Sequence, residues 1–130
     1  GQPIPKDAPP PPPPPPPGPT IKNGDTAWVA VEQYPRFKGG EEALMNFIFK
    51  NTKYPEVAKT NGIQGKVIIQ FVVTENGDVK GATILRSVSP ELDAEALRVV
   101  GLLPKFEKPG IKNGKPVPVF FALPINFKLN

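Results

Sequence analysis

The chain has 130 residues, which is enough for one domain of ordinary size and a short extension but not for two domains. It contains neither cysteine nor histidine, so disulfides, thiolate nucleophiles, histidine-based catalysis and most zinc sites are excluded. The formal net charge of +4 comes from basic residues spread singly along the sequence, which does not indicate a nucleic-acid-binding arm or a lipid-binding cluster.

The first segment is dominated by proline. Twelve of the 20 prolines lie within the first 19 residues, including an unbroken run from Pro9 to Pro17. Such a run cannot form a helix or a central strand, because proline lacks an N–H donor and its φ is fixed. We interpret residues 1–24 as an extended linker and residues 25–130 as the folded domain. A spacer is favoured over a ligand for an SH3-like groove, because the run lacks the flanking basic residue typical of such ligands.

The first predicted elements of the domain are a short strand at residues 28–31 and an amphipathic helix of about ten residues after the two glycines at 39 and 40. The helix has one apolar stripe, made of Ala43, Leu44, Phe47 and Ile48. Met45 and Phe49 form a second stripe, which we interpret as more core rather than a partner surface. Residues 55–60 then predict one or two further helical turns, because proline suits a helix start.

A β-hairpin is predicted next. Residues 66–74 alternate in hydropathy, with one apolar parity made of Val67, Ile69, Phe71 and Val73. Asn76-Gly77 predicts a type I′ turn. Residues 78–88 form the returning strand, in which Gly81 interrupts the alternation and predicts a bulge or a close backbone contact.

A second long helix is predicted to start at Ser89-Pro90-Glu91, which supplies a capping oxygen, a proline for the first turn and a carboxylate near the positive end of the dipole. Its apolar stripe consists of Leu92, Ala96, Val99 and Leu103, and Pro104 stops it. Residues 112–115 predict a turn before the last strand.

The last strand carries the strongest pattern in the sequence. Its apolar residues share one parity: Val117, Val119, Phe121, Leu123, Ile125, Phe127 and Leu129. Its prolines at 116, 118 and 124 share the other parity, so three N–H groups are missing on the side of one neighbour. This predicts the edge of a sheet. Phe120 and Ala122 keep their N–H groups between the prolines, so another chain could add a strand there.

The order of these elements predicts an α+β fold. Its architecture is a two-layer sandwich in which helices cover one face of an antiparallel sheet. With the hairpin strands numbered 1 and 2 and the final strand numbered 3, the expected strand order is 2-1-3.

The motifs in this order resemble the C-terminal domain of the TonB family over roughly residues 31–129. They are Tyr54-Pro55-x-x-Ala58, Gly62-Ile63-x-Gly65-x-Val67, Phe71-x-Val73, Asn76-Gly77-x-Val79, Ser87, Asp93, Ala96 and Pro124-Ile125-x-Phe127. Residues 34–40 look like the leader of one branch of that family, and the proline-rich linker fits it too.

The resemblance implies a non-enzymatic role in the periplasm of a Gram-negative bacterium. Family members are energy transducers anchored to the inner membrane by an N-terminal segment, which is not present in this chain and which couples to a proton-driven motor complex. They bind the TonB box, a short peptide of outer-membrane transporters, as a strand beside the last strand of the domain. A homodimer is a further candidate assembly, whereas no cofactor, metal, nucleic acid or small-molecule substrate is implied.

The edge argument and the resemblance together give a predicted partner site. It consists of Val117, Val119, Phe120, Phe121, Ala122 and Leu123, with Asn51, Lys53 and Tyr54 beside them. Two departures from the family pattern bear on it: Asn51-Thr52-Lys53 stands where better-known members often have Gln-Pro-Gln, and Phe106 stands where tryptophan is common. Because Pro118 and Pro124 shorten the edge, docking is expected to centre on residues 119–123.

Two other functions compete with this one. The same module is appended to membrane zinc-peptidase receptors of the beta-lactam-sensor type, where it would be a periplasmic sensor or docking domain. A small RNA-binding α+β domain is the alternative of another class, but the sequence lacks a basic-aromatic strand motif of the RNA-recognition type. The carboxylates of an enzyme would have to come from Asp78, Glu91, Asp93 and Glu95, which turn geometry and the helix dipole already explain.

Overall fold

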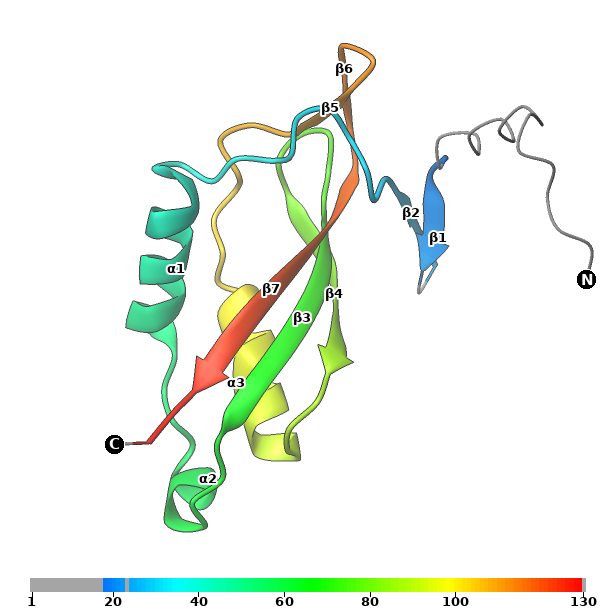
Figure 1. The fold of residues 1–130 in the computed structure, drawn as a ribbon. Helices are drawn as coiled ribbons and strands as arrows, with labels where there is room; N and C mark the ends of the chain where they lie inside the picture. The colour runs from blue at the N-terminus through cyan, green and yellow to red at the C-terminus, as the bar shows by residue number, and fades with distance from the viewer. Residues whose placement is uncertain (1–17, 23, 130) are drawn as a thin grey trace, which may run out of the picture.

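The computed structural model describes residues 18–22 and 24–129, and shows an antiparallel sheet with its main helices on one face (Figure 1). This arrangement confirms the predicted α+β two-layer sandwich. The elements in chain order are β1 (Thr20–Lys22), β2 (Asp25–Ala27), α1 (Gly40–Asn51), α2 (Glu56–Thr60), β3 (Gly65–Val73), β4 (Val79–Arg86), α3 (Pro90–Val100), β5 (Gly110–Lys112), β6 (Lys115–Val117) and β7 (Val119–Phe127).

The central strand of the main sheet is β3. It pairs antiparallel with β4 on one side and with β7 on the other, so the strand order is the predicted 2-1-3. The β3 side chains on the helix face are fully buried, as expected: Val67, Ile69, Phe71 and Val73. Complete burial of an apolar side chain stabilises the fold by about 1.5–3 kcal/mol, so this face is the main source of stability.

The helix α3 closes the core from the helix side. It begins as predicted, because the Ser89 hydroxyl caps it by accepting a hydrogen bond from the N–H of Leu92 at 3.2 Å, with Pro90 in the first turn. Its buried residues are Leu92, Ala96, Val99 and Val100. Phe106, which follows the helix, packs edge-on against Phe37 at 5.4 Å and Phe121 at 5.6 Å between ring centroids.

The turn between β3 and β4 differs from the prediction. A type I′ turn needs positive φ at both central residues. Gly77 has φ 88°, but Asn76 is not among the residues with positive φ. The Thr74 hydroxyl accepts hydrogen bonds from the N–H groups of Asn76 and Asp78, which favours a three-residue loop that ends at the left-handed glycine. The type I′ prediction is therefore wrong at this hairpin.

The type I′ pattern occurs instead between β5 and β6. Asn113 and Gly114 have φ values of 52° and 77°, and both lie in the left-handed region. The turn predicted for residues 112–115 is thus confirmed as a hairpin with two short strands. The irregularity predicted at Gly81 is confirmed too, because the β3–β4 register shifts between Gln70 and Val72 and Gly81 has φ 65°.

The last strand is shorter than predicted. Pro118 separates β6 from β7, so Val117 pairs with Gly110 in the β5–β6 hairpin and does not extend the edge of the main sheet. Two prolines close together, at 116 and 118, remove the donors that a continuous strand would need there. The buried parity of β7 nevertheless holds from Val119 to Phe127.

A second layer of chain lies over the other face of the sheet. The hairpin of β1 and β2 lies on the side away from α1 and α3 (Figure 1). Its Lys22 ammonium lies 5.6 Å from the Phe120 ring centroid, and its Asp25 carboxylate lies 3.6 Å from Lys80. These contacts flank Val72, which is only 1% exposed although it faces away from the helices.

The short strand predicted at residues 28–31 is not formed. β2 ends at Ala27, and Trp28 makes only an isolated bridge. The β1–β2 hairpin also includes residues 20–22, which the sequence analysis placed in the linker. The division of the chain at residue 24 remains a prediction, and the run from Pro9 to Pro17 lies outside the described residues.

Candidate functional site

The strand β7 forms one border of the main sheet. It pairs with β3 in continuous register from Gly65 opposite Phe127 to Val73 opposite Val119. Pro124 stands opposite Ile68 within this ladder without a register shift, which is compatible only with a position whose missing N–H would point away from β3. The N–H and C=O groups of the even-numbered residues of β7 therefore point away from the sheet.

Two hydrogen bonds to Trp28 independently show that the even-numbered backbone groups of this segment point outward. The N–H of Phe120 donates to the carbonyl of Trp28, and the N–H of Trp28 donates to the carbonyl of Pro118, both at 2.9 Å. Trp28 thus forms an isolated parallel bridge on the outer side of β7. The expectation that Phe120 keeps a free donor is wrong, because an upstream residue already uses it.

The open part of the edge consequently lies further along β7 than predicted. Ala122, Pro124 and Asn126 are exposed, and their outward backbone groups follow the position occupied by Trp28. Ala122 and Asn126 present both N–H and C=O groups, whereas Pro124 presents only its carbonyl. The open backbone groups therefore lie at residues 122–126, whereas docking was expected to centre on residues 119–123.

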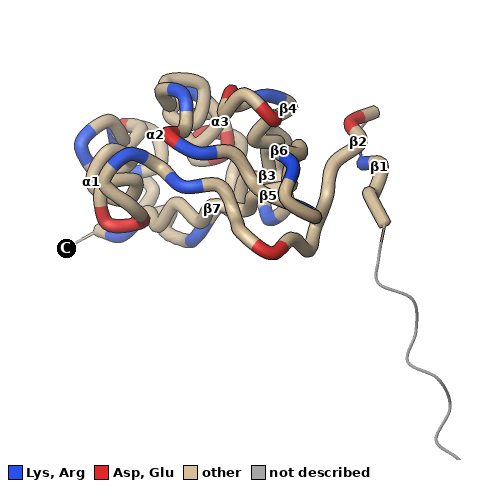
Figure 2. Tube along the Cα trace, turned by 90° about the horizontal axis from the view of Figure 1, so that it is seen from above, with Lys and Arg blue, Asp and Glu red and all other residues tan. Residues whose placement is uncertain are grey.

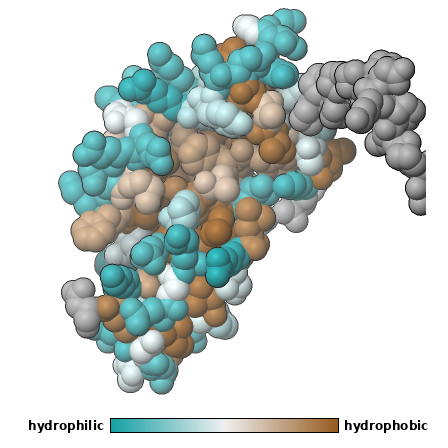
Figure 3. Space-filling model, viewed as in Figure 1, coloured by the Kyte–Doolittle hydropathy of each residue, from teal (hydrophilic) through white to brown (hydrophobic). Residues whose placement is uncertain are grey.

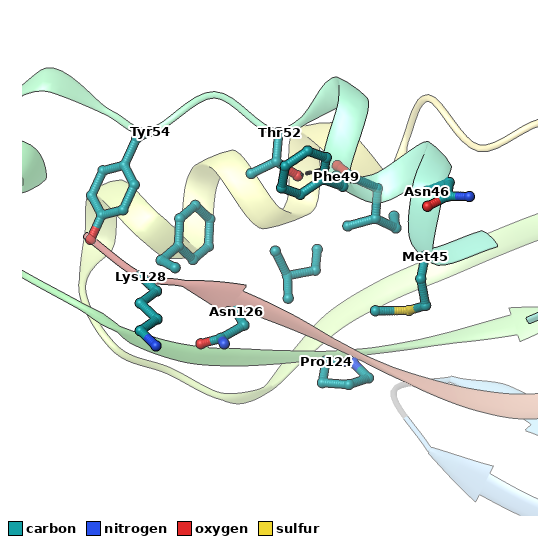
Figure 4. A pocket seen from close by; sticks show the side chains of 11 residues that line it. Met45, Asn46, Phe49, Thr52, Tyr54, Pro124, Asn126 and Lys128 are labelled. Atoms are coloured by element: carbon teal, nitrogen blue, oxygen red, sulfur yellow. Dashed lines mark hydrogen bonds between the residues drawn. The ribbon is translucent and has the colours of Figure 1, made fainter. Parts of the chain in front are cut away.

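A groove runs beside this open part of the edge, between α1 and β7 (Figure 4). Its volume is about 500 Å³. In Figure 4, Met45, Phe49 and Thr52 lie on the helix side, and Pro124 and Asn126 lie on the strand side. The groove is lined by Met45, Asn46, Ile48, Phe49, Thr52, Tyr54, Pro124, Ile125, Asn126, Phe127 and Lys128.

The groove wall on α1 is apolar and open to solvent. Phe49 is 85% exposed and Met45 is 39% exposed, although Leu44 and Ile48, one residue before each, are buried in the core. The second stripe of α1 is therefore not part of the core, contrary to the sequence-based interpretation. Figure 3 shows apolar surface, interspersed with polar residues, on the face where α1 and β7 lie next to each other.

Tyr54 closes one end of the groove. Its hydroxyl donates a hydrogen bond to the carbonyl of Ile63, and its ring meets the Phe127 ring edge-on at 5.6 Å between centroids. These two contacts fix the orientation of the phenol, so Tyr54 forms a rigid wall.

The residues before Tyr54 are attached to α3. The guanidinium of Arg98 donates to the carbonyl of Asn51 at 2.8 Å and to the Glu95 carboxylate at 2.7 Å. The same carboxylate accepts a hydrogen bond from the N–H of Lys53 at 2.6 Å. The hydrogen bond from Arg98, with a smaller contribution from the Lys53 N–H, lowers the pKa of Glu95 although partial burial opposes this. This network holds residues 51–53 beside the groove.

The predicted site residues take different places. Tyr54 lines the groove, whereas Thr52 lines it in place of its predicted neighbours Asn51 and Lys53. Phe120 is paired with Trp28, and Ala122 is on the open edge. The remaining predicted residues support the edge from behind or lie beyond it: Val119 and Leu123 in the core, Phe121 stacked on Phe71, and Val117 in β6.

Sequence reasoning missed Met45, Phe49, Pro124 and Asn126 as lining residues. The available signal was the second stripe of α1, which is offset by one residue from the core stripe. Its exposure could not be read from the helix alone, because it depends on β7 being the last strand of the sheet.

Other kinds of site find no support in the described part of the chain. No cluster of three carboxylates that could hold a metal ion occurs among residues 18–22 and 24–129. None of the helices in these ranges is long and apolar enough to cross a membrane. Lysines and arginines are distributed over many elements and are interspersed with acidic residues (Figure 2).

An open sheet edge beside an apolar groove is compatible with the addition of an extended peptide as a strand. Comparison with protein families identifies the family of the chain: residues 50–129 match the model of the Gram-negative bacterial TonB protein C-terminal domain. The chain belongs to this family. It is therefore a periplasmic transducer and interaction domain of the TonB type rather than an enzyme, and the family interacts with outer-membrane transporters.

Comparison with solved structures found two similar chains, one of which supports the fold. A solution structure of the Helicobacter pylori TonB C-terminal domain is 24% identical, covers 67% of this chain and 78% of its own, and has a TM-score of 0.53. A shorter structure of the same domain is 23% identical, covers 67% of this chain and 90% of its own, and has a TM-score of 0.49. A search of curated proteins gave no match.

Proposed function

We propose that this domain captures the TonB box of an outer-membrane transporter as an added strand along β7, centred on residues 122–126. The observation that carries the proposal is the outward-facing backbone of Ala122 to Asn126 beside an apolar groove. The strand would pair with the N–H and C=O groups of Ala122 and Asn126 and with the carbonyl of Pro124.

The groove supplies contacts that the backbone cannot. Side chains of an added strand point alternately to the two faces of the sheet. Those on the helix face would lie against Met45 and Phe49 of α1, which already border the space beside β7. An extended peptide with apolar residues at alternate positions fits this surface.

The binding free energy of a peptide depends on both backbone hydrogen bonds and side-chain contacts. About four main-chain hydrogen bonds at about 1 kcal/mol net each give only millimolar binding. Burying two large apolar side chains of the peptide against Met45 and Phe49 would add roughly 2–4 kcal/mol, which brings the dissociation constant to the micromolar range. Selectivity among peptides would come from the groove, because the backbone pairing is independent of sequence.

Membership of the family supports a proposal for the wider role. The domain would transmit proton-motive energy to the transporter for nutrient uptake, with an N-terminal segment outside this chain anchored in the inner membrane and coupled to the motor complex. Residues 1–24 would act as the periplasmic spacer between that anchor and the domain. An added strand suits this task, because a pull along the strand axis loads several hydrogen bonds at once.

The proposal is tested by an NMR titration of the whole chain with TonB-box peptides from transporters of the same genome. The amides of Ala122 and Asn126 and the side-chain signals of Met45 and Phe49 should shift together. The opposite edge of the sheet at Ile84 and Arg86 of β4, away from the Asp25–Lys80 contact, is an internal control that should not respond. Shifts confined to β4, or scattered shifts that a scrambled peptide also produces, would overturn the proposal.

A further inference from the structure

The edge of β7 has an occupant from the same chain. Residues 25–28, which we name the strap, run from the sheet face to the border of β7. The strap ends at Trp28, whose N–H and C=O groups bond to Pro118 and Phe120 at 2.9 Å each. These are the same kinds of outward backbone groups that Ala122 and Asn126 leave open further along the strand.

The contacts that hold the strap in place are individually weak. Asp25 pairs with Lys80 at 3.6 Å in an ion pair whose lysine side chain is 57% exposed, so solvent screens it. The Lys112 ammonium lies 5.4 Å from the Trp28 ring centroid. Ala27 is fully buried, but it is a small side chain with little apolar area. Because each of these contacts with the main sheet and with Lys112 is weak, the strap can be displaced without loss of the core.

The strap nevertheless fits a specific place on the sheet. The Asp25 carboxylate lies over Gly81, and a Cβ atom at Gly81 would come within 2.4 Å of the Oδ2 atom of Asp25. Gly81 lies at the bulge in β4 and has φ 65°, so this place on the sheet face is free of a side chain. The bulge thus creates the space that the strap occupies.

We propose that the strap competes with the partner peptide for the Pro118–Phe120 end of the edge. This inference rests on the proposed function and adds a limit to it. While the strap is bound, a partner strand pairs only along residues 122–126. When the strap is displaced, the N–H of Phe120 and the carbonyl of Pro118 become available and the edge lengthens by one hydrogen-bonding repeat.

The competition makes affinity depend on peptide length. A short peptide that covers residues 122–126 leaves the strap undisturbed. A longer peptide that reaches Pro118 must replace the two backbone hydrogen bonds of Trp28, so in the wild-type chain the extra length brings almost no gain. Weakening the strap should restore that gain.

Two substitutions in the full chain test this. Trp28→Pro removes the N–H that donates to Pro118, and Trp28→Ala keeps it, while both remove the indole. The comparison between them therefore isolates the backbone donor. Hydrogen exchange is measured first without peptide, with the Phe71 amide of β3 as a report on the intact core.

The wild-type Phe120 amide should be protected, and it should exchange at least tenfold faster in Trp28→Pro than in Trp28→Ala. Dissociation constants are then measured for the short and long peptides. In the wild-type chain the two should agree within about twofold, and in Trp28→Pro the long peptide should bind at least about fivefold more tightly.

Three results would count against the competition. A Phe120 amide that exchanges in the wild-type chain as fast as that of Ala122 would show that the strap does not hold the edge. Equal gains from peptide length in the wild-type chain and in Trp28→Pro would overturn the competition while leaving the proposed function intact. No binding of either peptide to any variant would overturn the proposed function and the competition with it.

Discussion

Ile48 and Phe49 are neighbours in α1 but differ in burial. Ile48 is 4% exposed and belongs to the core, whereas Phe49 is 85% exposed and borders the groove. An aromatic ring so far out of the core contributes little to folding, but it offers apolar area to a bound peptide.

The two residues therefore make a matched pair of substitutions. Phe49→Ala should change the free energy of unfolding by no more than about 0.5 kcal/mol but weaken peptide binding about tenfold. Ile48→Ala should cost about 2–5 kcal/mol of stability because it leaves a cavity. Urea denaturation and a binding titration separate these effects, and unchanged peptide affinity in Phe49→Ala would remove the groove from the site.

The carboxylate of Glu95 connects α3 to the residues that precede Tyr54. Its pKa lies below the ordinary value, mainly because Arg98 donates hydrogen bonds to the charged form. The unfolded chain, with a glutamate pKa of about 4.3, then binds more protons than the folded chain as the pH falls, so stability decreases toward acid.

A Glu95→Gln variant should accordingly lose about 1–2 kcal/mol of stability at neutral pH. The difference from wild type should be constant above about pH 5 and shrink as the pH falls through the lowered folded pKa of Glu95. Denaturation curves at several pH values measure it, with Glu107→Gln, an exposed carboxylate outside this network, as the control. A difference that does not change with pH would mean that the charge of Glu95 does not support residues 51–53.

At the scale of elements, the patterns that span many residues were predictive. The alternation of apolar residues in β3 and β7 predicted the core. The order of the elements, with the capped start of α3 between the hairpin and the last strand, predicted the strand order. The position of the prolines in the last strand predicted the edge. A period of two or of 3.6 residues is reliable when repeated over a long stretch, because each repeat buries another side chain on the same face.

Short elements were predicted less well, for a physical reason. β1, β2, β5 and β6 have three residues each, so no period can be established within them. The occupation of the edge by Trp28 was not predictable at all, because it is a contact between residues about 90 positions apart that depends on the finished sheet. The two Asn-Gly pairs show that local context decides a turn, since the hydroxyl of Thr74 favours a different loop at one of them.

The two glycines of these turns provide a comparison at this scale. An alanine at Gly77 would bring its Cβ within 2.6 Å of the backbone oxygen of Phe106, whereas an alanine at Gly114 would meet open space. Both have positive φ, so each should cost about 1–2 kcal/mol for the left-handed backbone, and Gly77→Ala should cost roughly 1–3 kcal/mol more for the clash. Equal losses of unfolding free energy in the two variants would show that the contact with Phe106 is not tight.

In the whole molecule, the two faces of the sheet and the edge of β7 are covered by different parts of the chain. Helices cover one face of the sheet, the β1–β2 hairpin and the strap lie over part of the other, and the edge of β7 is closed at one end and open at the other. Prolines limit the open edge without closing it, because Pro124 removes a donor but keeps an acceptor. If β7 accepts a partner strand as proposed, the binding site is short and defined, and the prolines limit other pairing at this edge.

Strand addition along β7 requires the outward backbone N–H of Ala122. Peptide dissociation constants of Ala122→Pro and Ala122→Val, compared with wild type, test this requirement. Ala122→Pro removes a backbone N–H that faces away from β3. Ala122→Val keeps this backbone N–H and places an apolar side chain at the same exposed position.

The proline variant should bind a TonB-box peptide at least about tenfold more weakly, while the valine variant should bind within about twofold of wild type and both should retain the wild-type fold. Undiminished binding by Ala122→Pro would show that the peptide is not held by this edge.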